Sequence, residues 1–133
     1  MNLTGSEIEQ DIYNLLKGSS IETIISGSVY KSGLRPINSN LEDAIVTFLA
    51  GISNQIQTGV VNLNIYVPDI ILNGQNVKNT ARIETIEAEI KTWFETLVNI
   101  KYEIKLDSTI KVFEEPDIQQ HFINTRLNFK LLT

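Results

Sequence analysis

The fold class of this chain is set by residues 81–97, ARIETIEAEIKTWFETL. The apolar side chains of this stretch recur every three or four residues, which places them along one side of an α-helix. They are Ile83, Ile86, Ile90, Trp93, Phe94 and Leu97. Thr80 is the expected N-cap. Because the segments on both sides change to the two-residue period of β-strands, the sequence predicts a small α+β fold.

Two apolar runs before this helix predict a pair of strands. Residues 43–52 place apolar side chains on both faces, which is typical of a strand that is central in a sheet or buried at an interface. Residues 60–67 alternate valine, leucine and isoleucine with asparagine and tyrosine. A polar segment that ends in glycine separates the two runs, so we expect a hairpin. A shorter strand is expected near residues 28–30.

The N-terminal part of the chain predicts a second helix, over residues 6–17. Ser6 and Glu9 have the spacing of a capping box, and Gly18 is a stop signal directly after Lys17. Between them, apolar residues recur at helical spacing: Ile8, Ile12, Leu15 and Leu16. A stripe this narrow is stable only when the helix packs on another element.

Three runs after the central helix predict further strands, over residues 102–106, 109–114 and 121–132. Asp107 and Ser108 are expected to form a short turn between the first two. The last run alternates apolar and polar side chains over its whole length. Together the segments predict an antiparallel or mixed sheet of about four to six strands packed against two helices, within a single domain over residues 1–133.

The composition excludes some classes of function. The net charge of −5 argues against binding nucleic acid through its phosphates, which requires clustered lysine and arginine. The chain has no cysteine, so it has neither a disulfide framework nor a thiolate metal site. The first ten residues lack the pattern of a signal peptide, and no apolar stretch reaches the roughly 18 residues that span a membrane. We therefore expect the protein to fold in the cytoplasm.

No set of residues has the spacing of a catalytic, cofactor or metal site. His121 is the single histidine and has no metal-ligand spacing around it, so we interpret it as a structural or surface residue. Glu114, Glu115 and Asp117 could attract a hard cation, but they lack the glycine and the spaced oxygens of a calcium loop. A solvated turn is the simpler interpretation. The sequence thus predicts a protein that is not an enzyme and that carries no cofactor.

Residues 69–80 form an expected loop with an unusual apolar run, which consists of Ile70, Ile71 and Leu72. Three adjacent apolar side chains are unfavourable in water, so they either fold back on the core or meet another chain. The following Asn73 begins a turn. Arg82 lies near the start of the central helix, where its charge opposes the helix dipole. It is either a surface arginine or one that is kept for a contact.

The order of these elements resembles the tail completion family of long-tailed phages, which comprises tail terminators and related minor tail proteins. Three places carry the resemblance. The N-terminal helix leads into a Gly-Ser-Val-Tyr stretch, residues 27–30, with Pro36 after it. The apolar strand pair of residues 44–52 and 60–67 follows. The helix that contains Trp93 then leads into the alternating residues 122–132.

The resemblance implies a non-enzymatic structural part of a phage or prophage tail. Such proteins form rings, usually hexameric, that cap the tail tube and join the tail to the head connector. The protein would then assemble in the host cytoplasm and end in the virion tail, without binding specific nucleic acid sequences or membranes. Head-to-tail rings need two different patches on each subunit. We expect Ile70, Ile71, Leu72, Asn73, Arg35 and Arg82 to contribute to such contacts.

Two other functions are compatible with the sequence. The first is a monomeric protein-binding module or a neck or adaptor protein, which would use an exposed sheet edge or the segment 69–80 to add a strand to a partner. The second is a small enzyme of unfamiliar type, which would need polar groups that converge in a pocket.

Overall fold

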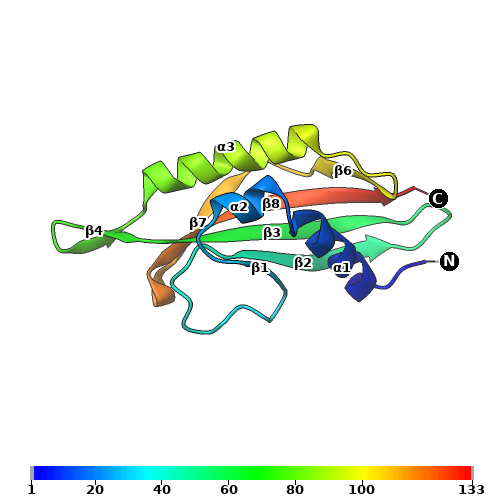
Figure 1. Cartoon of the computed structure of the whole chain (residues 1–133). Coiled ribbons are helices and arrows are strands. Elements are labelled where there is room, and N and C mark those ends of the chain that lie inside the picture. The colour runs from blue at the N-terminus through cyan, green and yellow to red at the C-terminus, as the bar shows by residue number, and fades with distance from the viewer. Residues whose placement is uncertain (1, 133) are drawn as a thin grey trace.

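A mixed sheet with helices on one face forms the body of the protein (Figure 1). The computed structural model describes residues 2–132. The helices are α1 (Gly5–Leu16), α2 (Ser20–Ile24) and α3 (Thr80–Thr96), with a short 3-10 turn at Pro116–Ile118. The main strands are β1 (Val29–Lys31), β2 (Ala44–Ile52), β3 (Thr58–Pro68), β6 (Tyr102–Leu106), β7 (Lys111–Glu115) and β8 (Gln120–Leu131). The α+β class and the sheet packed against helices confirm the prediction from the sequence.

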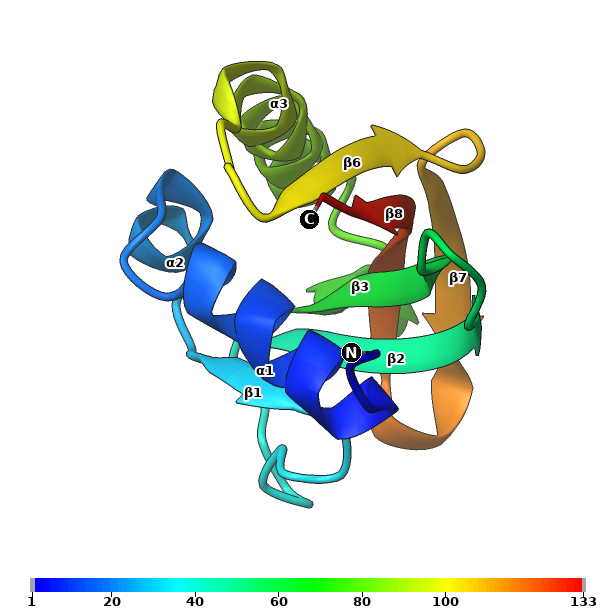
Figure 2. The ribbon, with the colours of Figure 1, turned by 90° about the vertical axis from the view of Figure 1, so that its right-hand side faces the viewer.

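The sheet order is β1-β2-β3-β8-β6, and β7 also pairs with β8. Only the pair of β1 and β2 is parallel among these six strands. Seen from the end that carries both termini, the three helices lie to one side of the sheet (Figure 2). Alternate residues of the central strands face this helical side and are fully buried, including Leu63, Ile65, Ile123 and Leu127.

The strands β6 and β7 follow one another along the same edge of β8. Tyr102 lies opposite Leu131, and Glu115 lies opposite Gln120. The chain between the two strands therefore continues in one direction, and the expectation of a turn at Asp107 and Ser108 was wrong, because both strands pair with β8 and not with each other. Asp107 explains this path, because its backbone N–H donates to the carbonyl of Arg126 at 2.8 Å and its carboxylate pairs with the guanidinium of that residue at 2.9 Å.

The apolar side of α3 is buried as predicted. Ile83, Ile86, Ile90 and Trp93 are at most 5% exposed, and Phe94 and Leu97 pack partly against the same core. The expected N-cap was one residue too late. Asn79 is the N-cap, since its side-chain oxygen accepts the backbone N–H of Arg82 at 3.2 Å. Burial of this side of α3 on the sheet fixes the helical layer.

The helix α1 begins earlier than the sequence predicted. Its capping box joins Thr4 and Glu7, and Ser6 lies inside the helix. The predicted partner, Glu9, has another role, because its carboxylate accepts the backbone N–H of Phe48 in β2 at 3.0 Å. The helix therefore gains a polar attachment to the sheet in addition to its buried apolar stripe of Ile8, Ile12 and Leu16.

Two short elements were absent from the prediction. Residues 20–24 form α2, capped by Ser19. The expected loop at residues 69–80 contains a hairpin, in which β4 (Ile70–Leu72) pairs with β5 (Gln75–Val77). Asn73 and Gly74 have φ angles of 52° and 76°, and two positive φ values are what the tightest hairpin turns require. Each of these elements is too short to show a period in the sequence.

The strand β2 lies between β1 and β3, which agrees with its predicted central place. Its burial is more limited than predicted. Ala44 and Val46 are fully buried, but Leu49 and Ile52 are 41% and 60% exposed. The register against β3 shifts between Phe48 and Ala50, and such a bulge interrupts the alternation of faces. Within residues 2–132, no helix has the length and apolar character that crossing a membrane requires.

Replacing Trp93 by alanine should lower the free energy of unfolding by roughly 3–5 kcal/mol, because the change leaves a cavity in the core. Denaturant unfolding followed by circular dichroism measures this loss, since the variant has no tryptophan fluorescence. The matched control is Glu95→Ala on the exposed side of α3, which should change stability by less than about 0.5 kcal/mol. Equal losses in both variants would contradict the assignment of the two sides of the helix.

Candidate functional site

The β4–β5 hairpin presents three apolar side chains to solvent. Ile70, Ile71 and Leu72 are 44%, 75% and 57% exposed, and none of them belongs to the buried core. In the described chain, β4 pairs with β5 and with no other strand. The hairpin extends beyond the sheet at the end opposite to both termini (Figure 1). Its exposed apolar surface is therefore available to another molecule, with Asn73 at its tip.

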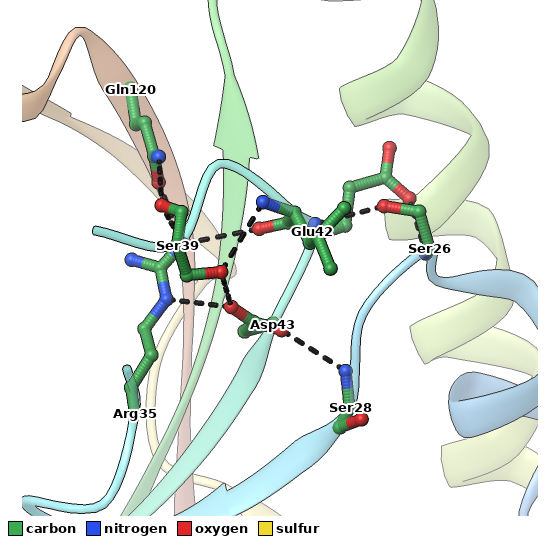
Figure 3. A network of polar contacts seen from close by, with 8 residues as sticks. Ser26, Ser28, Arg35, Ser39, Glu42, Asp43 and Gln120 are labelled. Carbon is green, nitrogen blue, oxygen red and sulfur yellow. Dashed lines mark hydrogen bonds and ion pairs between the residues drawn. The ribbon is translucent and has the colours of Figure 1, made fainter. Parts of the chain in front are cut away.

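Arg35, another residue expected at a contact, is held within the chain (Figure 3). Its Nε donates to Oδ2 of Asp43 at 2.8 Å, and its Nη2 donates to the side-chain oxygen of Gln120 at 2.9 Å. The guanidinium also lies 4.3 Å from the centroid of the Tyr66 ring. With 11% of its side chain exposed, Arg35 anchors the segment between β1 and β2. That segment itself presents apolar side chains, among them Ile37, which is 93% exposed.

Arg82 likewise has partners in its own chain. Its guanidinium donates to both carboxylate oxygens of Glu42, at 2.6 and 2.8 Å, and to the carbonyl of Ile24. The hydrogen bond to Glu42 raises the pKa of Arg82 above its ordinary value. Glu42 also accepts the backbone N–H of Ser26 at 3.0 Å. Arg82 thus connects α3 to the end of α2 and to the start of β2.

Gly27 permits the close approach of the segments around this network. Its backbone N–H donates to the carbonyl of Glu42 at 2.9 Å. A Cβ at this position would overlap the Oδ1 atom of Asp43, the same atom that accepts the N–H of Ser28 at 3.0 Å. The glycine is needed here for space.

His121 is paired with an acidic residue at the base of the hairpin. Its Nδ1 lies 2.6 Å from Oδ1 of Asp69, and the two side chains are 14% and 9% exposed. They line a depression of about 290 Å³ together with Glu114. Within residues 2–132, no group of three or more histidine and carboxylate side chains is placed to hold a metal ion. The acidic residues predicted as a solvated turn do not converge on a site.

Tyr102 and Asp11 form the contact between β6 and α1. The Tyr102 hydroxyl donates to Oδ2 of Asp11 at 2.6 Å. Burial, together with this hydrogen bond, raises the pKa of Tyr102 well above its ordinary value. Burial alone would raise the pKa of Asp11, but hydrogen bonds from Lys101 and Tyr102 lower it below its ordinary value. Both pKa shifts are explained by the contact that joins β6 to α1.

One depression of the surface was not apparent from the sequence. It is an apolar groove of about 540 Å³ across β2, β3, β8 and β6, at the end where β2 turns into β3. Ile52, Val60 and Phe129 contribute its apolar lining, and Lys105 and Lys130 stand among its polar residues. Its residues come from four separate segments. No single stretch of sequence could therefore indicate it.

Replacing Gly27 by alanine should lower the free energy of unfolding by about 1–3 kcal/mol, the usual cost of inserting a methyl group into a packed site. The methyl group would displace Asp43 from its partners. Gly51→Ala is the matched control, because its Cβ would meet atoms at 3.1 and 3.2 Å in an exposed part of β2. Thermal unfolding compares the two. A smaller loss at Gly27 than at Gly51 would count against the proposed packing.

Replacing Arg35 by methionine should lower the free energy of unfolding by roughly 3–5 kcal/mol, because it leaves a buried carboxylate without its ionic partner. The Asp43 side chain is 1% exposed. The matched control is Lys17→Met, which removes an ion pair to Glu22 whose side chains are 42% and 28% exposed. The control should lose less than about 1 kcal/mol. Denaturant unfolding measures both, and equal losses would contradict a structural role for Arg35.

The fold of this chain has similar structures among known proteins. No protein-family model and no curated protein matches the chain. One similar solved structure is a chain from the virion of the native gene transfer agent particle, with a TM-score of 0.52 and 10% identity over 90% of each chain. Another solved chain has a TM-score of 0.52 and 16% identity, over 99% of this chain and 98% of its own length. The protein therefore shares its α+β fold with a chain of a gene transfer agent virion.

Proposed function

We propose that this protein is a non-enzymatic structural part of a phage or prophage tail. The observation that carries the proposal is the fold shared with a chain of the gene transfer agent virion over 90% of both chains. The role we favour is that of a tail terminator or completion protein, which caps the tail tube and joins it to the head connector. The protein would assemble in the host cytoplasm and remain in the virion tail, with tube and connector proteins as its partners.

The exposed hairpin supports a role in assembly. Ile70, Ile71 and Leu72 together form an apolar projection, and such a surface usually marks a protein contact. A homo-oligomeric ring, usually of six subunits in the family that the sequence resembles, would bury it. Ring formation is head-to-tail, so the hairpin would meet a different patch on the neighbouring subunit.

The charged networks also favour a structural role. Arg35 pairs with Asp43, and Arg82 pairs with Glu42. Both pairs join segments that are distant in sequence, and neither pair lines a described depression. Their charges are used to hold the subunit together.

A monomeric protein-binding module, or a neck or adaptor protein, is the alternative. The observation that favours it is the free edge of the β4–β5 hairpin, whose strands pair only with each other among the described residues. A partner could add a strand there. In that case the hairpin would bind a different protein and not a second copy of this chain.

Light scattering behind a sizing column, over a range of protein and salt concentrations, tests the proposed ring. We expect a discrete species with a mass about six times the 15.0 kDa of one chain, visible as closed rings by negative-stain electron microscopy. The apolar part of the contact should resist salt. A chain that remains monomeric at every concentration would contradict the self-assembling ring and favour the binding module.

A further inference from the structure

The hairpin and the apolar groove lie at opposite ends of the molecule. β3 connects the two places, since Thr58, Gly59 and Val60 at its start line the groove and Pro68 at its end leads into β4. Strand geometry separates these ends by roughly 33 Å. In Figure 1 the hairpin is at one end, and the β2–β3 turn and both termini are at the other.

We propose that the β4–β5 hairpin of one copy of this chain inserts into the groove of a second copy. The inference rests on the proposed function, because a head-to-tail ring needs two different patches that match. The proposed contact identifies the hairpin and the groove as these two patches. Since they lie at opposite ends, each subunit can donate its hairpin to one neighbour and accept the hairpin of another.

The hairpin has the properties of an element that is completed by a partner. Its strands have three residues each, and an isolated two-stranded hairpin is marginally stable in water. Ile71 at its centre is 75% exposed. The tight turn at Asn73 and Gly74 keeps its tip narrow. Docking would remove these apolar side chains from water and support the strands at the same time.

The groove has the matching shape and chemistry. Its volume of about 540 Å³ lies in the range of sites that enclose a ligand. Ala50, Ile52 and Val60 bring apolar side chains to the same face of the sheet, since Ala50 pairs with Val60 and Ile52 pairs with Thr58. Ile52 in its lining is 60% exposed. The exposed apolar side chains of β4 can therefore replace water at this place.

The charges of the two ends favour head-to-tail contact over contact between two hairpins. Glu114, Glu115 and Asp117 lie at the hairpin end and form no ion pair within the described chain, and Lys78 offsets only one of them. At the groove end Lys105 pairs with Glu103 at 3.1 Å, so that Lys130 is the groove lysine without an ion pair among the described residues. Opposite potentials attract, and two acidic hairpin ends would repel each other.

Cysteine cross-linking tests the contact directly, because the chain has no native cysteine. Ile71→Cys and Ile52→Cys variants are prepared separately, mixed and oxidised. We expect a disulfide-linked heterodimer as the main product, since the two Cβ atoms must approach within about 4.5 Å. Ile71→Cys mixed with Leu34→Cys is the control, because Leu34 is 61% exposed outside both patches. Cross-linking mainly between two Ile71→Cys chains would overturn the proposal.

A pair of blocking variants provides the second measurement. Ile71→Glu blocks the hairpin and Ala50→Glu blocks the groove. Each should raise the dissociation constant of self-assembly by about 100-fold or more, because the contact would then bury an unpaired carboxylate. Mixed together, the two should form a one-to-one dimer, because one intact hairpin and one intact groove remain. Ile118→Glu is the control, at a position that is 41% exposed near the hairpin end. Thermal unfolding verifies that the variants fold.

The outcomes separate this contact from the proposed function. If both blocking variants assemble as well as the wild type, the hairpin–groove contact is wrong, whereas the proposed ring is not contradicted. If the mixture of blocking variants stays monomeric although each single variant is folded, the contact is also wrong. A wild type that never assembles contradicts the ring itself, and this contact with it.

Discussion

The structure depends on two adjacent buried carboxylates directly before β2. Glu42 and Asp43 are 7% and 0% exposed, and a buried charge is tolerated only with a close partner and further hydrogen bonds. Arg82 reaches Glu42 from α3, and Arg35 reaches Asp43 from the preceding loop. The two arginines approach the carboxylates from different sides. Glu42 and Asp43 therefore hold both the helical layer and the loop at one place on the sheet.

Much of the fold follows from periodicity over long segments. The alternation of β3 and β8 and the helical stripe of α3 are each repeated often enough to be read without a structure. The failures have physical reasons. The helix α2 has five residues and each strand of the β4–β5 hairpin has three, which is less than two turns or two alternations. The capping box was misplaced because Ser6 and Glu9 satisfy the same local spacing as Thr4 and Glu7.

The candidate site shows a different limit of prediction from the sequence. Ile70, Ile71 and Leu72 were apparent because they are contiguous, and the structure leaves them exposed. The sequence could not indicate the partners of Arg35 and Arg82, since Gln120 and Glu42 are distant in the chain and are brought near only by folding. The groove was hidden for the same reason. A local sequence pattern shows which side chains one segment exposes. A groove forms only where several segments come together, so no local pattern reveals it.

The pairing of β3 with β8 has a consequence for the order of events during folding. Residues 58–68 pair with residues 120–130, so this central ladder closes only after most of the chain is available, and such non-local pairing is slow. The β4–β5 hairpin lies within the enclosed segment and depends on neighbours a few residues away. It can form on the microsecond timescale of hairpins. Before the ladder closes, the hairpin forms only transiently, because so short a pair of strands is marginally stable by itself. Its apolar side chains are then exposed together with the uncovered apolar face of β3, which makes this stage the one most exposed to premature association.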